Sequence, residues 1–172
     1  MKVDLASSIR NIPDFPKPGV QFKDITTLLK DKVAFRETVE RLVTLFEGES
    51  VDEVVGIEAR GFAIGAPVAY LLGSGFIPVR KKGKLPGDIL AQTYDLEYGS
   101  ATLEIHRDAI QTGQKIVVID DLLATGGTAQ AVCKMIEELG GRILGLAFVI
   151  ELASFHGRKL LPGYPVHSLL QL

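Results

Sequence analysis

The residues best suited to chemistry lie directly after one apolar stretch, Ile116–Ile119. Two adjacent carboxylates, Asp120 and Asp121, come first, and a loop containing Thr125-Gly126-Gly127-Thr128 follows them. Glycines let a backbone approach a ligand closely, and the free N–H groups at the start of a following helix attract a phosphate. Carboxylates would repel a phosphate, but they are good acceptors for the adjacent hydroxyls of a sugar. The pattern therefore predicts a site for a ribose phosphate.

A simpler interpretation of the same segment is purely structural. A strand, a glycine turn and a helix follow one another in many α/β proteins, and Thr128 could act only as a helix N-cap. Glycine-rich motifs alone also give many false matches. The paired aspartates and the Thr-Gly-Gly-Thr loop nevertheless fall within one short window, residues 120–128. We therefore favour the functional interpretation.

Residues 118–128, Val-Ile-Asp-Asp-Leu-Leu-Ala-Thr-Gly-Gly-Thr, resemble the phosphoribosyl diphosphate (PRPP) motif of type I phosphoribosyltransferases. The particular residues of this motif are similar to those of the adenine-specific members, and the resemblance spans nearly the whole chain. It implies that Asp120 and Asp121 orient the ribose. It also implies a set of residues that binds the 5′-phosphate: Ala124, Thr125, Gly126, Gly127 and Thr128.

Basic residues at two other places match the part of this family that holds diphosphate. Arg60 follows the predicted strand Val51–Ile57, and the resemblance places it beside the diphosphate after a cis peptide between Glu58 and Ala59. A basic run broken by glycine follows Phe76–Val79, and such a run is usually solvated surface unless a turn folds it around an anion. The expected diphosphate contacts are Arg60, Arg80, Lys81 and Lys84.

The N-terminal segment, residues 1–30, corresponds to the hood that covers the base in the adenine-specific members. The resemblance implies that Phe22 stacks on the purine, while the main chain of Gln21 and Lys23 contacts its edge. From the sequence alone Phe22 would be assigned to the hydrophobic core, so this role depends on the resemblance.

Residues 82–103 resemble the mobile catalytic loop of the family. Members specific for hypoxanthine and guanine have an aspartate base in the phosphate loop, where this chain has Ala124. In adenine-specific relatives, the glutamate of Leu-Glu-Tyr-Gly is the proposed substitute, which is Glu97 here. We therefore expect Glu97, Tyr98 and Arg60 to be the catalytic residues, although Glu97 and Tyr98 could also form an ordinary polar turn.

The elements that position these residues follow from hydrophobic periodicity. Apolar residues at helical spacing predict an amphipathic helix over residues 31–47, and Leu5 and Ile9 predict a short helix within residues 1–12. Continuous apolar runs predict strands buried on both faces, as in a parallel sheet. Such runs lie at 76–79, 116–119 and 143–150, and a further strand is expected at 51–57, where Asp52 and Glu53 interrupt the apolar residues. Further helices are expected to end at Leu72 and to span Ala129–Leu139.

Composition sets broad limits on the function. The 172 residues are enough for one domain, and a net charge of −2 gives no reason to expect nucleic-acid binding. The single cysteine, Cys133, fits a reducing compartment and is more consistent with packing than with a nucleophile. The N-terminal residues lack the apolar run of a signal peptide, and no run is long enough to cross a membrane. We therefore expect a cytoplasmic protein.

The expected fold is α/β, with a central, mostly parallel, twisted sheet flanked by helices and a small N-terminal hood. The resemblance implies purine salvage by phosphoribosyl transfer from PRPP to adenine, with Mg²⁺ carried by PRPP near Asp120 and Asp121 and with no confident direct metal ligand. It also implies a homodimer. Two alternatives stay open, namely a transferase for xanthine or guanine and a non-catalytic PRPP-sensing regulator. Ala124 and the Leu-Glu-Tyr-Gly segment count against the first, and the lack of an added nucleic-acid-binding domain counts against the second.

Overall fold

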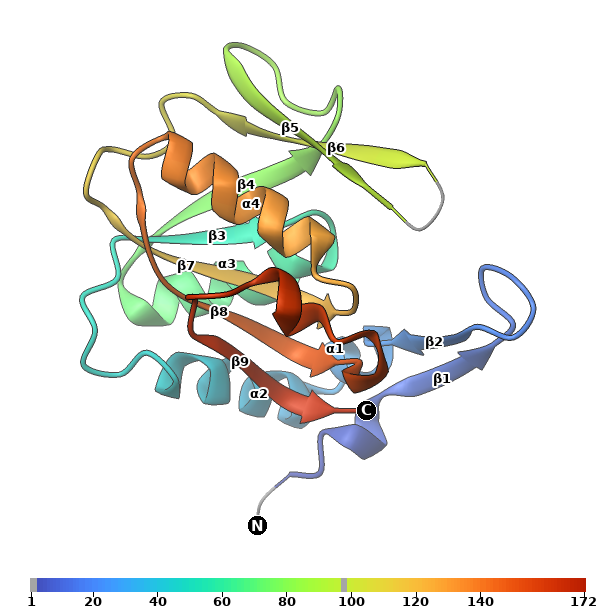
Figure 1. Cartoon of the computed structure of the whole chain (residues 1–172). Coiled ribbons are helices and arrows are strands. Elements are labelled where there is room, and N and C mark those ends of the chain that lie inside the picture. Colours follow the sequence, from blue (N-terminus) through green and yellow to red (C-terminus); the bar gives the residue numbers. More distant parts are fainter. Residues whose placement is uncertain (1–2, 97–98) are drawn as a thin grey trace.

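The computed structural model describes residues 3–96 and 99–172, and within them seven strands form one twisted sheet. The strand order is β5-β6-β4-β3-β7-β8-β9. Five strands from β4 to β9 run parallel, whereas β6 pairs antiparallel with β4 and with β5. The expected α/β fold is therefore confirmed, with an antiparallel hairpin added at one edge of the parallel sheet (Figure 1).

The bounds of the elements follow the predicted periodicity closely. The strands of the sheet are β3 (Glu53–Ile57), β4 (Gly75–Lys81), β5 (Ile89–Asp95), β6 (Ser100–His106), β7 (Lys115–Leu123), β8 (Arg142–Glu151) and β9 (Val166–Gln171). The helices are α1 (Thr26–Lys30), α2 (Lys32–Thr44), α3 (Arg60–Leu72) and α4 (Gly127–Glu138), with short 3₁₀ turns η1 (Ala6–Ser8), η2 (Ala153–Phe155) and η3 (Gly157–Leu160). Among the described residues, no helix combines the length and the apolar character needed to cross a bilayer.

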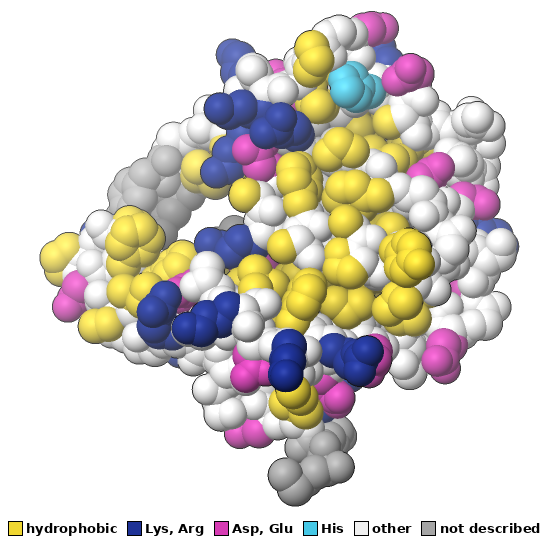
Figure 2. All heavy atoms as spheres, turned by 180° about the vertical axis from the view of Figure 1, so that it is seen from behind, with side chains coloured by type: hydrophobic (Ala, Val, Ile, Leu, Met, Phe, Trp, Pro, Cys, Tyr) yellow, Lys and Arg dark blue, Asp and Glu magenta, His cyan; other side chains and the backbone are white. Residues whose placement is uncertain are grey.

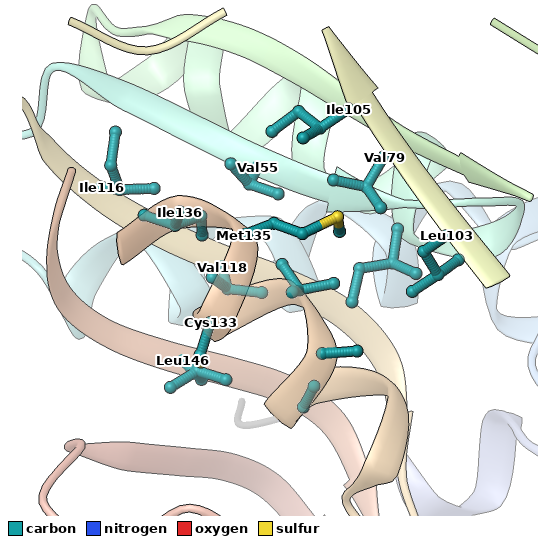
Figure 3. Close-up of a cluster of buried hydrophobic side chains, with 14 of the residues drawn as sticks. Val55, Val79, Leu103, Ile105, Ile116, Val118, Cys133, Met135, Ile136 and Leu146 are labelled. Carbon is teal, nitrogen blue, oxygen red and sulfur yellow. The ribbon is translucent and has the colours of Figure 1, made fainter. Parts of the chain in front are cut away.

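The central strands are buried on both faces because alternate side chains enter two different hydrophobic clusters. In β7, Ile116 and Val118 pack under α4, whereas Val117 and Ile119 pack against α2 and α3. Figure 3 shows the first cluster, in which Met135 and Ile136 of α4 lie over the strands. Burying an aliphatic side chain contributes about 1.5–3 kcal/mol, so these clusters fix helices to both faces of the sheet.

Cys133 belongs to the hydrophobic cluster under α4, in agreement with the prediction that it has a packing role and is not a nucleophile. The thiol is buried, and this burial raises its pKa to about 12. A thiol with so high a pKa holds almost no thiolate near neutral pH and makes a poor nucleophile. The packing role is therefore confirmed.

The N-terminal segment forms a separate antiparallel pair, β1 (Arg10–Pro13) with β2 (Gln21–Asp24). The predicted helix within residues 1–12 is wrong apart from the single turn η1, because residues from Arg10 onward pair with β2 instead. Arg10 also bonds to the buried carboxylate of Asp24, and this contact lowers the pKa of Asp24 to about 2. Pairing with a distant strand therefore overrides the local helical spacing.

Candidate active site

A cavity of about 480 Å³ opens at the carboxyl ends of β3 and β7, where parallel sheets commonly bind ligands. Residues from four parts of the chain line it. They include Glu58 and Arg60 after β3, Lys81 at the end of β4, Tyr94 and Leu96 of the hairpin, and residues 120–126 at the end of β7. The hairpin β5–β6 and the pair β1–β2 both project on this side of the molecule (Figure 1). The fold therefore gathers most of the predicted site residues around one cavity.

Asp120 and Asp121 lie inside β7 and not at its end as expected. The strand continues to Leu123 because β8 continues to pair with it, with Asp120 opposite Phe148 and Leu122 opposite Ile150. Successive side chains of a strand point to opposite faces, so the two carboxylates leave the strand in different directions. Both nevertheless line the cavity.

Arg60 and Gly61 at the start of α3 contact the two aspartates. Nε of Arg60 lies 2.5 Å from Oδ2 of Asp121, whose side chain is only 8% exposed. Gly61 lies against Asp120, because a Cβ atom at Gly61 would come within 2.9 Å of Oδ1 of Asp120. A side chain at this position would therefore displace the carboxylate.

Asp120 is a strongly perturbed titratable group among the described residues of the site. Burial is the main cause that raises its pKa well above the ordinary value, and the neighbouring charge of Asp121 raises it further. Its Oδ1 accepts a hydrogen bond from the backbone N–H of Asp121 at 2.9 Å, which acts in the opposite direction. Carboxylates with raised pKa values in a cavity are typical of functional sites.

The loop between β7 and α4 has the geometry of an anion cradle. Gly126 has a φ of +88°, a conformation that side chains rarely adopt, and it precedes the first turn of α4. The free N–H groups and the positive end of the helix dipole at such a helix start attract an anion. Gly126 and not Thr128 is the N-cap residue, so the alternative that Thr128 merely caps the helix is wrong.

Gly157 supports the cradle from behind, a contact that the sequence did not indicate. A Cβ atom at Gly157 would lie 2.2 Å from the carbonyl oxygen of Ala124, and one at Gly126 would lie 2.4 Å from the carbonyl oxygen of Gly157. Arg158 bonds through two nitrogens to the carboxylate of Glu151 at the end of β8. The 3₁₀ turn η3, which carries Gly157, is therefore attached to β8 through Arg158 and packs against the loop at Ala124.

The basic segment is organised by Glu58, another residue that sequence reasoning missed. Oε2 of Glu58 accepts from the backbone N–H of Lys81 at 3.0 Å and from Nε of Arg80 at 3.2 Å. These contacts, the backbone one first, lower the pKa of Glu58. Arg80 also donates to the carbonyl oxygen of Lys84 at 3.2 Å. Of the predicted diphosphate contacts, Arg60 and Lys81 line the cavity, and Arg80 bonds to the lining residue Glu58, whereas Lys84 is not among the lining residues in the described part of the chain.

The predicted base-binding residues lie on β2, beside Arg60. The guanidinium carbon of Arg60 is 5.3 Å from the centre of the Phe22 ring, and Phe15 contacts the same ring edge-on at 5.1 Å. Phe22 is half-buried and belongs to neither hydrophobic cluster of the described residues, so it is not a core residue. Gln21 and Lys23 flank it on the strand, and none of the three lines the cavity as described.

Glu97 and Tyr98 lie outside the described residues, so their predicted catalytic role stays a prediction. Their neighbour Leu96 and the preceding Tyr94 line the cavity. Tyr94 is a further residue that sequence reasoning missed, and its hydroxyl lies 3.0 Å from Oγ1 of Thr128. Only the pairing of β5 with β6 and the packing of the hairpin on α4 reveal this contact.

Residues 3–96 and 99–172 contain no cluster of three or more His, Cys, Asp or Glu side chains that could hold an ion. Asp120 and Asp121 are instead two carboxylates beside a predicted phosphate site. Mg²⁺ is typically held by one or two carboxylates together with substrate phosphates, and this donor set fits that arrangement.

Comparison with known proteins places the chain in a family. Residues 28–163 match the phosphoribosyl transferase domain. The adenine phosphoribosyltransferase of Desulfitobacterium hafniense is 57% identical over 169 residues, which cover 98% of each chain. The crystal structure of the Thermoanaerobacter pseudethanolicus adenine phosphoribosyltransferase superposes with a TM-score of 0.95 at 52% identity, covering 98% of each chain. That of Saccharomyces cerevisiae, complexed with an imino-altritol bisphosphate and adenine, gives 0.90 at 38% identity, covering 96% of each chain. The chain belongs to the adenine phosphoribosyltransferase family.

Proposed function

We propose that the protein transfers the 5-phosphoribosyl group from PRPP to adenine, with AMP and diphosphate as products. The observation that carries this proposal is the convergence of Asp120, Asp121, the 124–128 loop and Arg60 on one cavity. A sugar with vicinal hydroxyls, a phosphate on one side and a diphosphate on the other matches these groups. The named relatives support adenine as the acceptor.

PRPP would lie across the carboxyl ends of β3 and β7. The carboxylates of Asp120 and Asp121 would accept the ribose hydroxyls, and the backbone N–H groups of residues 124–128 with the Thr128 hydroxyl would hold the 5′-phosphate. This contact is remote from the reacting carbon, so its binding energy serves to orient the substrate. Arg60 and Lys81 line the cavity where the leaving diphosphate develops charge, and Arg80 and Lys84 lie next to them.

Adenine would enter between the cavity and the β1–β2 pair, which we propose as the hood. Phe22 offers an aromatic face there, because it is half-buried and contacts Arg60 and not the core. Stacking on Phe22 would fix the plane of the base, and the extended backbone at Gln21 and Lys23 offers donors and acceptors to its edge.

Mg²⁺ is proposed as the cofactor, held through PRPP and the carboxylates of Asp120 and Asp121. When bound, the ion would neutralise the diphosphate and make it a better leaving group. Among the protein's own residues, Arg60 holds Asp121 in place, and Gly61 leaves room for the carboxylate of Asp120. These contacts orient the acceptors before substrate binds.

Adenine must lose its N9 proton as the new bond to the ribose forms. Ala124 has no side-chain group that could accept a proton, and we propose Glu97 as the base, with Tyr98 beside it in the sequence. Segment 82–103, which includes most of the β5–β6 hairpin, would close over the cavity and exclude water that could hydrolyse PRPP.

A homodimer is the proposed assembly. Figure 2 shows a broad exposed area of hydrophobic side chains on the face behind the sheet. Helix α3 lies on that side, and its Tyr70 and Leu71 side chains are 83% and 53% exposed. Contiguous exposed apolar surface commonly marks a protein interface. The cytoplasmic location stays a prediction.

The decisive experiment is an assay of PRPP-dependent turnover with adenine, hypoxanthine, guanine and xanthine, with and without Mg²⁺. We expect diphosphate and AMP with adenine, and little product with the three 6-oxopurines. Turnover with guanine or xanthine in preference to adenine would contradict the proposed specificity. PRPP binding without turnover of any base would indicate a regulator.

A further inference from the structure

The hydroxyl groups of Tyr94 and Thr128 are in direct contact across two elements. Tyr94 lies on β5 of the hairpin and Thr128 in the first turn of α4, 34 positions later, with their oxygens 3.0 Å apart. The Tyr94 ring is half-buried against the core cluster under α4, and it also packs over Gly127. Both residues line the cavity. The contact therefore joins the hairpin to the cradle itself.

Either oxygen can donate in the unliganded protein, because each hydroxyl carries one proton and can accept. An anion in the cradle removes this freedom. A phosphate oxygen accepts hydrogen bonds, so Thr128 must direct its single proton to the phosphate. The contact with Tyr94 then survives only if Tyr94 donates to the Thr128 oxygen. Such a chain of hydroxyls strengthens each bond through polarisation.

We propose that Tyr94 is a positioning residue for the 5′-phosphate, whose hydroxyl donates to Thr128 and thereby turns the Thr128 proton toward the phosphate. This inference rests on the proposed function, since it needs a phosphate in the cradle. It also couples phosphate binding to the hairpin, because the donor lies on β5, three positions before Glu97. A substrate lacking the 5′-phosphate gains nothing from the contact.

The test compares two tyrosine hydroxyls, each of which forms a hydrogen bond to a side chain of α4. Tyr94→Phe removes the hydroxyl at the cradle, whereas Tyr164→Phe removes a hydroxyl that donates to Glu137 near the other end of the helix. One lost hydrogen bond to an orienting donor should raise the KM for PRPP roughly three- to tenfold. The KM for adenine should stay unchanged in Tyr94→Phe, and both constants should stay unchanged in Tyr164→Phe.

A double-mutant cycle with Thr128→Val separates positioning from mere stabilisation of the fold. Binding of PRPP and of ribose 5-phosphate is measured in all four proteins, together with their melting temperatures. Tyr94→Phe should weaken both ligands in the Thr128 background and have no further effect once Thr128 is valine. Equal weakening in both backgrounds, or a lower melting temperature with unchanged ligand affinity, would overturn the proposal.

The same set of variants distinguishes failure of the proposed function from failure of the role proposed for Tyr94. If the parent protein shows no turnover of PRPP with adenine, the proposed function is wrong. The ribose 5-phosphate arm of the cycle would then still decide whether Tyr94 acts through Thr128 on a bound phosphate. If the parent turns over PRPP and Tyr94→Phe matches it in KM, only the role of Tyr94 is refuted.

Discussion

Nε of Arg60 lies 2.5 Å from Oδ2 of Asp121, although 61 positions separate the two residues. The contact exists because β3 and β7 are neighbours in the sheet and both end at the cavity. The carboxylate is buried, while the Arg60 side chain keeps 38% of its surface exposed. One cation is therefore positioned by the protein and remains available to a ligand.

Asp121→Asn should lower kcat/KM for PRPP. The substitution removes the charge that holds Arg60 and one proposed acceptor for the ribose. Hydrogen bonds to charged groups are worth about 1.5–3 kcal/mol, or roughly ten- to hundredfold. Steady-state kinetics with varied PRPP would measure this loss. Glu37→Gln is the matched control, because it breaks the Arg41–Glu37 ion pair on the distant helix α2. An equal loss in both variants would indicate general destabilisation instead.

Asp120→Asn should change stability with pH in a defined direction. Burial raises the pKa of Asp120 above its unfolded value of 3.8, so only the unfolded state releases this proton readily as the pH rises. The wild-type carboxyl therefore costs no stability below that value and increasingly destabilises the fold above it. Asparagine cannot ionise, so the unfolding free energy of the variant should rise relative to that of the wild type as the pH increases above the unfolded pKa.

Urea titrations at several pH values would measure this difference, and PRPP turnover would be measured in parallel. We expect the variant to be relatively more stable at pH 7 yet impaired with PRPP, because one ribose acceptor has lost its charge. A stability difference that is independent of pH would refute the assigned burial of the charge.

Phe22→Ala should raise the KM for adenine and leave the affinity for PRPP largely intact. Stacking of a base on an aromatic side chain is worth roughly 1–3 kcal/mol, so an increase of about tenfold or more is expected. Phe155→Ala is the control, since Phe155 is an exposed phenylalanine on η2 and not on the β1–β2 pair. Unchanged adenine affinity measured by calorimetry, together with lower stability, would return Phe22 to a structural role.

Gly157→Ala should disturb the cradle from behind. The new methyl group would lie 2.2 Å from the carbonyl oxygen of Ala124, and overpacking of this kind typically costs about 1–3 kcal/mol. We expect a lower melting temperature and weaker PRPP binding, because the loop must shift. Lys159→Ala in the same 3₁₀ turn is exposed and should change neither. Wild-type PRPP affinity in Gly157→Ala would show that the loop does not depend on this support.

Glu97→Gln should slow the chemical step while both substrates still bind. General acid–base assistance is typically worth roughly 10²–10⁴-fold, and glutamine cannot accept the N9 proton. Single-turnover kinetics would isolate this step from product release, and Asp95→Asn, two positions earlier, is the control. A wild-type chemical rate in Glu97→Gln would mean that the proton leaves by another route.

Much of the site was predictable because its residues are close together in the sequence. The paired aspartates, the glycine loop and the following helix occupy residues 120–138, and hydrogen bonding within a helix is local. Continuous apolar runs likewise predicted the buried strands, because a strand covered on both faces needs apolar side chains at every position. The sequence alone thus determined the α/β class and the local arrangement of the loop that we propose as the phosphate cradle.

Only the tertiary structure decided the contacts that depend on strand order. Arg10 and its neighbours form β1 because β2 is available to pair, and β7 passes through the aspartates because β8 continues beside it. The contacts of Glu58 with Arg80, of Gly157 with Ala124 and of Tyr94 with Thr128 join segments 22 to 34 positions apart. No local periodicity encodes such pairs, because they arise when the sheet brings the ends of separate elements to one edge.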